Sequence, residues 1–348
     1  MNVGLRARPW AGLDVGEYSV KLLALQPGVG GVRHFVSEVP LGPAAEGEPA
    51  AEATARAIGQ AFSLAGLTPR GVSGVTLGLT SSDVIVKQIT LPAMDDDEVA
   101  GALRFEARKH LPFDPASCVI DYQVLGRIPS EKRLDVLLAA VPQPRLERAI
   151  APLKVLGVEA DIVDAAPLAL TNAISRGAER DSEARVLLDF GHAGSWLTLY
   201  QRGAPYFSRR LDFGGARVTQ VIAQQTRVPV DEAEEWKLEA GSDDPSMRVS
   251  PDAPEMLAVH TALGQLADEL RRSFTFYRTL GPLPDPFSLW ISGSTARLPG
   301  LAGQLSELLE VPTFVFDPLD ALGADYRTSA PPGGPQFAQA YGLALRAA

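Results

Sequence analysis

The feature of this sequence that most constrains its fold is a short pattern that occurs twice, half a chain apart. Residues 12–16 read Gly-Leu-Asp-Val-Gly and residues 187–191 read Leu-Leu-Asp-Phe-Gly, so Asp14 and Asp189 stand 175 positions apart (189 minus 14). Each copy is typical of a strand that ends in Asp-x-Gly, and a second apolar run follows each one closely. Repeats of solenoid proteins are about 20–50 residues long. The longer period seen here predicts two related lobes around a cleft.

The composition limits the classes of function. With 348 residues the chain has room for two domains. Its net charge of -10 opposes binding to phosphate backbones, so nucleic acid is not an expected partner. One cysteine and four scattered histidines provide neither a disulfide framework nor zinc-ligand spacing, and Cys118 is expected to be an inert core residue. Neither a signal peptide nor an apolar run near 18 residues is found, which predicts a soluble cytoplasmic protein.

The first half carries an extra segment. After a predicted helix at 51–65 and a predicted strand at 74–79, residues 84–156 contain the pattern of a separate unit. We expect its strands at 84–89, 118–125 and 134–141, and its helices from Asp95 onward and at 143–156. The helix from Asp95 is well marked, because acidic residues crowd its positive end and basic residues its negative end. The segment is predicted to be a small α+β subdomain inserted into the first lobe.

The second half continues the alternation of strands and helices. We expect helices at 218–225, 231–240, 255–280, 300–309 and 336–345. A buried strand at 288–291 runs directly into the sequence Ser-Gly-Ser-Thr at 292–295. A Gly-containing loop between a strand and a helix lets the backbone contact a ligand, although a plain loop is an equally good interpretation.

The two repeated turns have a defined chemistry. An Asp at the end of a strand, followed by x-Gly, presents a carboxylate beside backbone N–H groups that a phosphate can approach closely. Because Mg²⁺ keeps several waters and takes few carboxylates, Asp14 and Asp189 are candidates to hold a hydrated Mg²⁺-triphosphate between them. One such motif alone would be interpreted as ordinary turn chemistry. Lys21 is placed to reach a phosphate or is simply solvated.

Other residues leave alternatives open. Arg297 either stacks on a base or forms a surface ion pair, and His192 is expected to be a loop histidine. The sequence contains no Walker A motif, no G-x-G-x-x-G and no G-x-S-x-G, so the common phosphate-loop folds and the serine-hydrolase elbow are not supported.

The order of these parts resembles the actin-like ATPase superfamily, whose ribonuclease H-like unit is duplicated. The insertion after the strand that ends near residue 79 resembles the FtsA and PilM branch. Within that branch, residues 10–345 are similar to the type IV pilus assembly protein PilM family. The similarity is carried by VIVKQITLP at 84–92, FEARKHLPF at 105–113, DY at 121–122, GG at 214–215, AEEWK at 233–237 and ISGSTARLPGL at 291–301.

This resemblance implies an α/β fold of two actin-like lobes with a small α+β subdomain inserted into the first. The first lobe would comprise residues 1–82, 157–181 and 325–348, with 83–156 as the inserted, partner-docking subdomain. The second lobe would comprise residues 182–220 and 285–324, with a helical subdomain at 221–284 on the side of the nucleotide base.

The resemblance also implies a function. The chain would be a cytoplasmic ATP-binding adaptor that docks the N-terminal cytoplasmic tail of the inner-membrane protein PilN. It would link the pilus alignment subcomplex to the motor ATPases and reach the membrane only through these partners. The implied cofactors are ATP and Mg²⁺.

The implied site residues fall into three groups. Asp14, Gly16, Ser19 and Lys21 would face the phosphates and Mg²⁺ from one lobe, and Asp189, Gly191 and Ser195 from the other. Gly214, Gly215, Glu234 and Lys237 would line the ribose and base side, and Gly293, Ser294 and Arg297 would close over the adenine. For the partner groove between the first lobe and the inserted subdomain, the candidates are Arg104, Phe105, Lys109 and Leu111. Alternatively, Phe105 and Leu111 only pack the helix.

Two departures from the family pattern bear on activity. Gly194 and Trp196 replace a hydroxyl-rich turn, which leaves fewer donors for a terminal phosphate. Ala166 stands where relatives often have a polar residue that could orient a hydrolytic water. We therefore expect ATP binding with slow or absent hydrolysis. A small-molecule kinase of the same superfamily, an FtsA-like division or filament protein and a type II secretion counterpart are the alternative functions.

Overall fold

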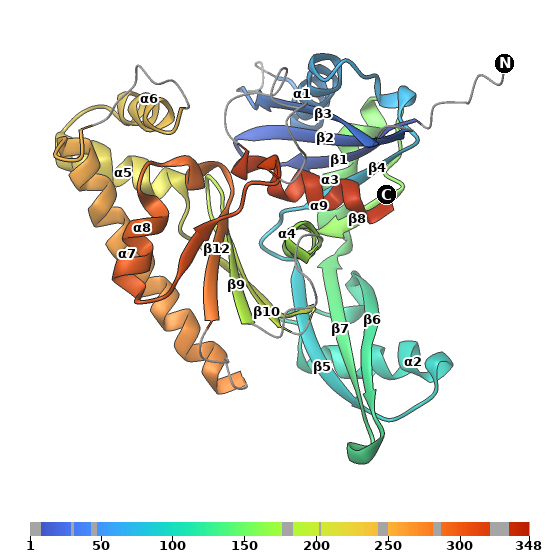
Figure 1. Cartoon of the computed structure of the whole chain (residues 1–348). Coiled ribbons are helices and arrows are strands. Elements are labelled where there is room, and N and C mark those ends of the chain that lie inside the picture. Colours follow the sequence, from blue (N-terminus) through green and yellow to red (C-terminus); the bar gives the residue numbers. More distant parts are fainter. Residues whose placement is uncertain are drawn as a thin grey trace.

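A five-stranded sheet forms the centre of the first lobe (Figure 1). The structure is a computed structural model that describes residues 8–28, 31–42, 47–175, 184–201, 203–242, 250–280, 287–320 and 334–347. The sheet has the order β3-β2-β1-β4-β8. Its strands are β1 (Trp10–Val15), β2 (Ser19–Gly28), β3 (Gly31–Pro40), β4 (Gly74–Leu79) and β8 (Ile162–Ala165). The first three strands are antiparallel, and β1, β4 and β8 run parallel. The strands β3 and β8 were not predicted.

The second lobe repeats this arrangement. Its strands are β9 (Ala184–Phe190), β10 (Ser195–Gln201), β11 (Ala204–Leu211), β12 (Phe287–Ser292) and β13 (Thr313–Val315). They lie in the order β11-β10-β9-β12-β13, which has the same directions as the first sheet. The duplicated two-lobe α/β fold predicted from the repeated Asp-x-Gly pattern is therefore confirmed.

Helices cover both faces of each sheet. Those around the first sheet are α1 (Ala50–Leu64), α3 (Gln143–Val155), α4 (Ala166–Ser175) and α9 (Ala338–Ala344). Because side chains alternate along a strand, Leu22 packs in the cluster with α1, and Leu23 packs with α9. Gly12 allows α9 to lie directly on β1, since a Cβ at Gly12 would be 2.1 Å from the Ala340 carbonyl oxygen. Helix α4 also contacts the second sheet through Leu170 and Leu187, so α4 and α9 lie between the two sheets.

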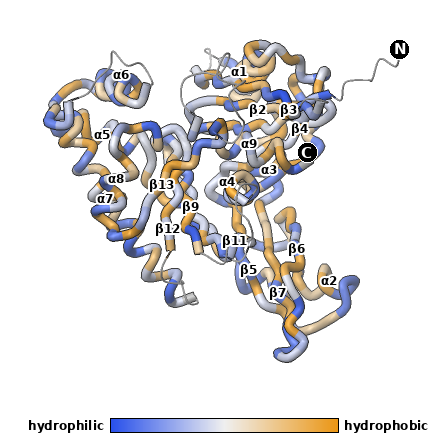
Figure 2. The backbone as a smooth tube through the Cα atoms, in the orientation of Figure 1, coloured by the Kyte–Doolittle hydropathy of each residue, from blue (hydrophilic) through white to orange (hydrophobic). Residues whose placement is uncertain are grey.

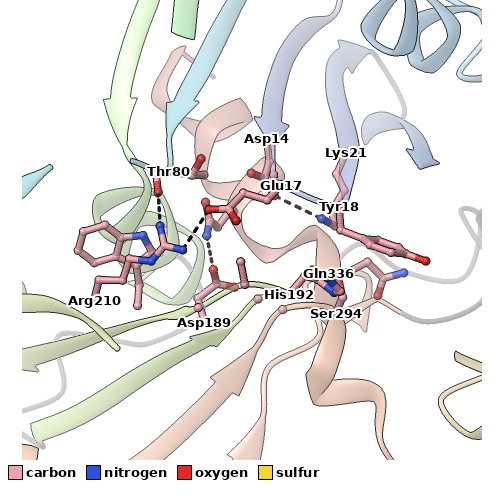
Figure 3. A pocket seen from close by; sticks show the side chains of 17 residues that line it. Asp14, Glu17, Tyr18, Lys21, Thr80, Asp189, His192, Arg210, Ser294 and Gln336 are labelled. Atoms are coloured by element: carbon pink, nitrogen blue, oxygen red, sulfur yellow. Dashed lines mark hydrogen bonds and ion pairs between the residues drawn. The ribbon is translucent and has the colours of Figure 1, made fainter. Parts of the chain in front are cut away.

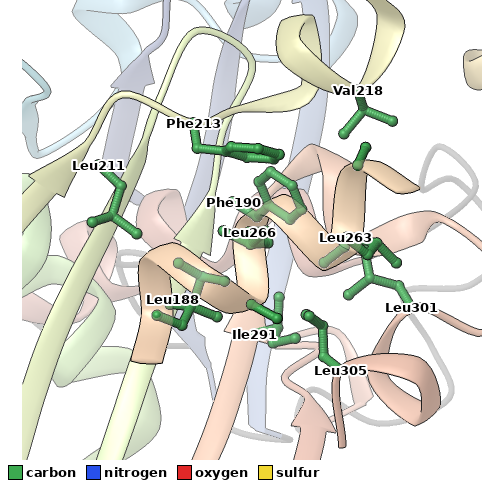
Figure 4. Close-up of a cluster of buried hydrophobic side chains, with 14 of the residues drawn as sticks. Leu188, Phe190, Leu211, Phe213, Val218, Leu263, Leu266, Ile291, Leu301 and Leu305 are labelled. Carbon is green, nitrogen blue, oxygen red and sulfur yellow. The ribbon is translucent and has the colours of Figure 1, made fainter. Parts of the chain in front are cut away.

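The largest core lies in the second lobe, between its sheet and the helices on its outer side (Figure 4). These helices are α5 (Gly215–Thr226), α6 (Val230–Ala240), α7 (Pro254–Leu280) and α8 (Leu301–Leu309). Phe190, Leu263 and Ile291 are fully buried there. Figure 2 shows hydrophobic residues along the strands that these helices cover. This packing holds the turn that follows β9 in a fixed position.

The inserted segment forms a unit of its own that projects from the two lobes (Figure 1). Its elements are β5 (Ile85–Pro92), α2 (Asp96–Glu106), β6 (Cys118–Ile128) and β7 (Arg133–Pro142). Helix α2 begins with a capping box in which Asp95 and Glu98 satisfy each other's backbone N–H groups. Its buried face packs on the sheet through Val99 and Leu103. The charge pattern at its two ends therefore predicted this helix correctly.

The sheet of the inserted unit continues the sheet of the second lobe. Phe207 of β11 pairs with Lys87 of β5, which gives an eight-stranded sheet in the order β13-β12-β9-β10-β11-β5-β7-β6. Cys118 lies half-buried on the outermost strand of this sheet, so the expectation of a core cysteine is wrong. The residue limits assigned above to the four parts of the chain stay predictions, and the limits at 181, 284 and 325 lie outside the described residues. In the described part of the chain, no helix has the length and apolar content needed to cross a bilayer.

Candidate functional site: the cleft between the lobes

The turns after β1 and β9 meet at the base of a cleft between the two lobes (Figure 3). The antiparallel hairpins hold the turns, and α9 and the short helix Pro335–Phe337 close the floor. The residues that line the cleft are Asp14, Gly16, Glu17, Tyr18, Lys21, Thr80, Asp189, Gly191, His192, Ala193, Gly194, Trp196, Arg210, Gly293, Ser294, Gln336 and Gln339. Seven of these were predicted as site residues: Asp14, Gly16, Lys21, Asp189, Gly191, Gly293 and Ser294.

Asp14 is the buried anion of the first turn. Residues Asp14 and Lys21 face each other across the β1–β2 ladder, and their Oδ2 and Nζ atoms are 3.8 Å apart. Burial raises the pKa of Asp14, and the charge of Lys21 opposes this shift. Its other oxygen, Oδ1, is buried and has no hydrogen-bond partner in the described part of the chain. Asp14 therefore has an oxygen available for a ligand in the cleft.

Asp189 occupies the matching position in the second turn. Its Oδ2 accepts a hydrogen bond from the amide of Gln339, which comes from α9, and its Oδ1 accepts one of 3.4 Å from the Ser292 hydroxyl. Burial, followed by the nearby charge of Asp14, raises the pKa of Asp189 to about 6. The two carboxylates therefore destabilise each other, and a cation bound near them would relieve that repulsion.

The donor set fits a particular kind of metal ion. Among the described residues, no group of three or more His, Cys, Asp or Glu side chains is arranged to hold a metal. Asp14 and Asp189 instead offer two carboxylates beside the backbone of the two glycine-containing turns. Mg²⁺ is commonly bound by one or two carboxylates, with waters and substrate phosphates as the other ligands. These residues fit a hydrated Mg²⁺ that arrives with a phosphate chain.

Ser294 begins a short helical turn (Ser294–Arg297) at one wall of the cleft. Gly293, just before it, has a φ of +89°, and a Cβ there would lie 2.5 Å from the carbonyl oxygen of Phe190. Only glycine fits this close approach between the chain after β12 and the end of β9. The loop was predicted from its Ser-Gly-Ser sequence after a buried strand.

Seven predicted site residues do not line the cleft. The Ser19 hydroxyl donates to Glu38 at 2.7 Å, and the Ser195 hydroxyl donates to the carbonyl of Phe213 at 2.6 Å. Both hydroxyls therefore bond within their own lobe. The other five are Gly214, Gly215, Glu234, Lys237 and Arg297.

Lys237 is the centre of a buried network between α5 and α6. Its ammonium donates to the Gly215 carbonyl at 3.0 Å, to the Thr219 hydroxyl at 2.7 Å and to a Glu234 carboxylate oxygen at 2.7 Å. Burial lowers the pKa of Lys237, and Glu234 opposes this shift. With all three ammonium donors used, the network ties the start of α5 to α6 beside the cleft.

Several residues of the cleft were not predicted as site residues. Tyr18 and Glu17 lie inside the first turn, so their position next to Asp14 was the signal that could have found them. His192 was expected to be an ordinary loop histidine, yet its ring lies 4.7 Å from that of Tyr18 and its Nδ1 lies 3.9 Å from Glu234. Ala193, Gly194 and Trp196 lie in or just after the second turn, so their position close to Asp189 was the available signal. The other unpredicted residues come from distant segments and carry no local motif: Thr80, Arg210, Gln336 and Gln339.

The cleft is narrow at this end. The space between the turns measures about 70 Å³. The first turn contacts the second lobe through the pair Tyr18 and His192 and through the pair Glu17 and Arg210. A ligand that enters between the turns would exchange these contacts.

A second hollow of about 650 Å³ separates the inserted unit from the first lobe. One face of the β6–β7 sheet forms one wall, with Val119, Asp121 and Ala139 among its residues. β8 and α4 form the opposite wall, with Asp164 and Leu168. We call this hollow the docking groove.

The residues predicted for partner binding do not line the docking groove. Helix α2 covers the other face of the inserted sheet. Arg104 and Lys109 are exposed there, and the Phe105 side chain is 77% exposed. Leu111 is buried in the core of the inserted unit, where it packs the helix. The remaining three form a separate surface on the opposite side of the sheet from the groove.

Two duplicated lobes that meet at paired Asp-x-Gly turns define the class of fold, which is the actin-like one. The particular family follows from the sequence: the family model described as type IV pilus assembly protein PilM matches residues 12–348, and the chain belongs to this family. The chain is 27% identical to a protein in the solved structure of a PilM-PilN type IV pilus biogenesis complex, with a TM-score of 0.79 and 98% of each chain covered.

More distant structures share the fold alone. The ethanolamine utilization protein EutJ from Carboxydothermus hydrogenoformans is 13% identical, with a TM-score of 0.56 over 97% of this chain and 89% of that one. A diol dehydratase-reactivating factor in its nucleotide-free form is 12% identical, with a TM-score of 0.57 over 97% of this chain and 99% of that one.

Proposed function

We propose that this chain is an ATP-binding adaptor of the type IV pilus assembly machinery, which holds MgATP between its lobes and docks the N-terminal cytoplasmic tail of PilN. The observation that carries the nucleotide part is the pair of buried carboxylates, Asp14 and Asp189, at the meeting point of two glycine-containing turns. The partner part is supported by the similarity to the PilM-PilN complex over nearly the whole chain.

Within the cleft, each residue has a distinct task. Asp14 and Asp189 would hold Mg²⁺ through its waters, and Lys21 would bind a phosphate as a point charge. The backbone of Gly16 and Gly191 would approach the phosphate oxygens. The metal supplies charge neutralisation for the phosphate chain when bound. Gly293 and Ser294 would contact the nucleoside. The other predicted residues of this side would support that wall of the cleft without lining it: Gly214, Gly215, Glu234, Lys237 and Arg297.

We propose that hydrolysis is slow or absent. Ala166, at the start of α4, is fully buried and has no polar side chain with which to orient a water. Hydrolysis in nucleotide switches uses a residue that orients the attacking water. Binding rather than turnover would then set the state of the cleft.

The PilN tail is proposed to bind in the docking groove. A groove of about 650 Å³ suits an extended peptide whose side chains enter pockets on one face of a sheet. The exposed surface of Arg104, Phe105 and Lys109 is the second candidate, because an exposed phenylalanine beside two cations is a common contact residue. Through PilN the chain would be held at the inner face of the cytoplasmic membrane and would link the alignment subcomplex to the motor ATPases.

The test of the nucleotide part is calorimetric titration of MgATP into the wild-type chain and into Asp14→Ala. We expect binding in the micromolar range that the variant loses. Asp97→Ala removes an exposed acid of α2 and serves as the control with the same change in charge. If neither protein binds nucleotide but the PilN tail peptide still binds, the ATP-dependent part of the proposal is wrong.

The test of the partner part compares the two faces of the inserted sheet. Ala139→Trp fills the docking groove, whereas Arg104→Glu with Lys109→Glu reverses the charge of the other surface. We expect only Ala139→Trp to weaken binding of a synthetic PilN tail peptide, by at least about tenfold. The opposite pattern would assign docking to the surface on α2. Peptide affinity that neither change affects would contradict docking on the inserted unit.

A further inference from the structure

Arg210, near the end of β11, reaches across the cleft from the second lobe (Figure 3). One guanidinium nitrogen lies 3.1 Å from a Glu17 carboxylate oxygen in the first turn, and another donates to the Thr80 carbonyl at 3.4 Å. The Arg210 side chain is 18% exposed, whereas that of Glu17 is 59% exposed. A largely buried cation in a narrow cleft is thus paired with an acid that is mostly in water.

The second turn leaves space for this guanidinium. A Cβ on Gly194 would lie 2.8 Å from the Arg210 Nε and 2.9 Å from its Nη2, so only glycine at this position lets the arginine lie along the turn. The four residues of the turn, Gly191-His192-Ala193-Gly194, carry no hydroxyl. Arg210 therefore supplies hydrogen-bond donors to a stretch of the cleft wall whose own side chains offer few.

The ion pair that Arg210 forms with Glu17 is weak. Ion pairs with a solvent-exposed carboxylate contribute little to stability, because water competes for both charges. A phosphate that carries two negative charges accepts paired hydrogen bonds from the planar guanidinium, and such bonds are among the strongest in proteins. A phosphate that enters the cleft would therefore displace Glu17 from Arg210.

We propose that Arg210 binds the terminal phosphate of a nucleoside triphosphate and gives up its contact with Glu17 in doing so. The inference rests on the proposed nucleotide site. It adds a residue that distinguishes a triphosphate from a diphosphate, because a diphosphate held by the carboxylates and Lys21 lacks the group that Arg210 contacts. Glu17 then acts as a competitor for Arg210 that lowers triphosphate affinity.

The experiment measures the affinities of MgATP and MgADP by calorimetry for the wild type, Arg210→Gln, Arg210→Lys and Glu17→Gln. Arg210→Gln should weaken MgATP binding about 10- to 100-fold and change MgADP binding less than about twofold. Arg210→Lys should lose an intermediate amount, since an ammonium lacks the planar fork. Glu17→Gln should strengthen MgATP binding by up to about fivefold. Arg209→Gln is the control, because the preceding side chain points to the other face of β11.

The outcomes separate this inference from the function on which it rests. Suppose that the wild type binds MgATP, that Asp14→Ala does not, and that Arg210→Gln binds it as the wild type does. This result would overturn the role of Arg210 and keep the nucleotide site. Equal losses of MgATP and MgADP affinity in Arg210→Gln would also overturn it. A wild-type chain that binds neither nucleotide would remove both. If Arg210→Gln does not fold, Arg210→Lys and Glu17→Gln still decide, because the inference requires their MgATP affinities to change in opposite directions.

Discussion

The rings of Tyr18 and His192 lie against each other with their centroids 4.7 Å apart and an angle of 31° between their planes. Tyr18 belongs to the turn after β1 and His192 to the turn after β9, so this contact joins the corresponding turns of the two repeats. Burial, followed by the charge of Lys237, lowers the pKa of His192. The lowered pKa favours the uncharged form of the ring that lies against Tyr18.

Tyr18→Ala should speed the entry of nucleotide. An aromatic pair contributes about 0.5–1.5 kcal/mol beyond its buried area, and this contact must break for the turns to part. We expect the association rate of MgATP, measured by stopped flow, to rise about three- to tenfold. Phe314→Ala removes an exposed ring on β13 and should leave the rate unchanged. An unchanged rate in Tyr18→Ala would show that the turns part without breaking this contact.

The raised pKa of Asp189 predicts how stability depends on pH. Because burial and the Asp14 charge raise it to about 6, the folded chain binds more protons than the unfolded chain between about pH 4 and pH 6. The contribution of Asp189 to the free energy of unfolding therefore falls as the pH rises through this window. Relative to the wild type, Asp189→Asn should gain about 1–3 kcal/mol between pH 4 and pH 7.

The measurement is urea unfolding at pH 4.5, 5.5 and 7.5. Asp97→Asn, which removes an exposed acid, provides the control for the change in net charge. A difference between Asp189→Asn and the wild type that stays constant with pH would contradict the raised pKa.

Gly12→Ala should destabilise the first lobe. The new Cβ would lie 2.1 Å from the Ala340 carbonyl oxygen and 2.5 Å from the Ala344 nitrogen, both of them helix backbone that cannot move alone. We expect a loss of about 3 kcal/mol in the free energy of unfolding. Gly264→Ala, in α7 with nothing within 4 Å of its Cβ, should instead gain about 0.5–1 kcal/mol. Equal melting temperatures for the two variants would exclude this close packing.

The buried network around Lys237 should be structural. Lys237→Met leaves the Glu234 carboxylate without its cation, which should cost about 3 kcal/mol in the free energy of unfolding. The double variant Glu234→Gln with Lys237→Met should recover most of that loss, since no unpaired charge remains. Chemical unfolding of the single and double variants gives the coupling energy. A Lys237→Met variant with wild-type stability but lost MgATP affinity would assign the lysine to the nucleotide instead.

The elements that the sequence predicted are those with a local cause. Two tight Asp-x-Gly turns indicated the hairpins of both lobes. Helix α2 was indicated by the acidic residues at its start and the basic residues at its end. Strand β3 was missed because most of its side chains are exposed or half-buried, so no alternation marks it. The joining of the inserted sheet to the second lobe was missed as well. It depends on Phe207 and Lys87, which are far apart in the chain and share no motif.

The same distinction holds for the cleft. Asp14 and Asp189 are the second-last residues of their strands, and Gly293 directly follows one. The chain around each of them is enough to predict its position. Gln339 and Arg210 reach the cleft from α9 and β11, and only the packing of the two lobes brings them to Asp189 and Glu17. Ser19 and Ser195 begin the strands that follow the two turns, but their hydroxyls bond to neighbours that the sequence cannot reveal.

The sheet of the inserted unit is joined to the second lobe, whereas the chain connects the inserted unit to the first lobe. Its sheet is an extension of the second lobe through Phe207 and Lys87, yet the chain enters it from β4 and leaves it through α3, which packs on α1. The two walls of the docking groove consequently belong to different halves of the molecule. Rotation of one half against the other would therefore change the width of the groove. A peptide that binds between these walls would therefore respond to the angle between the lobes.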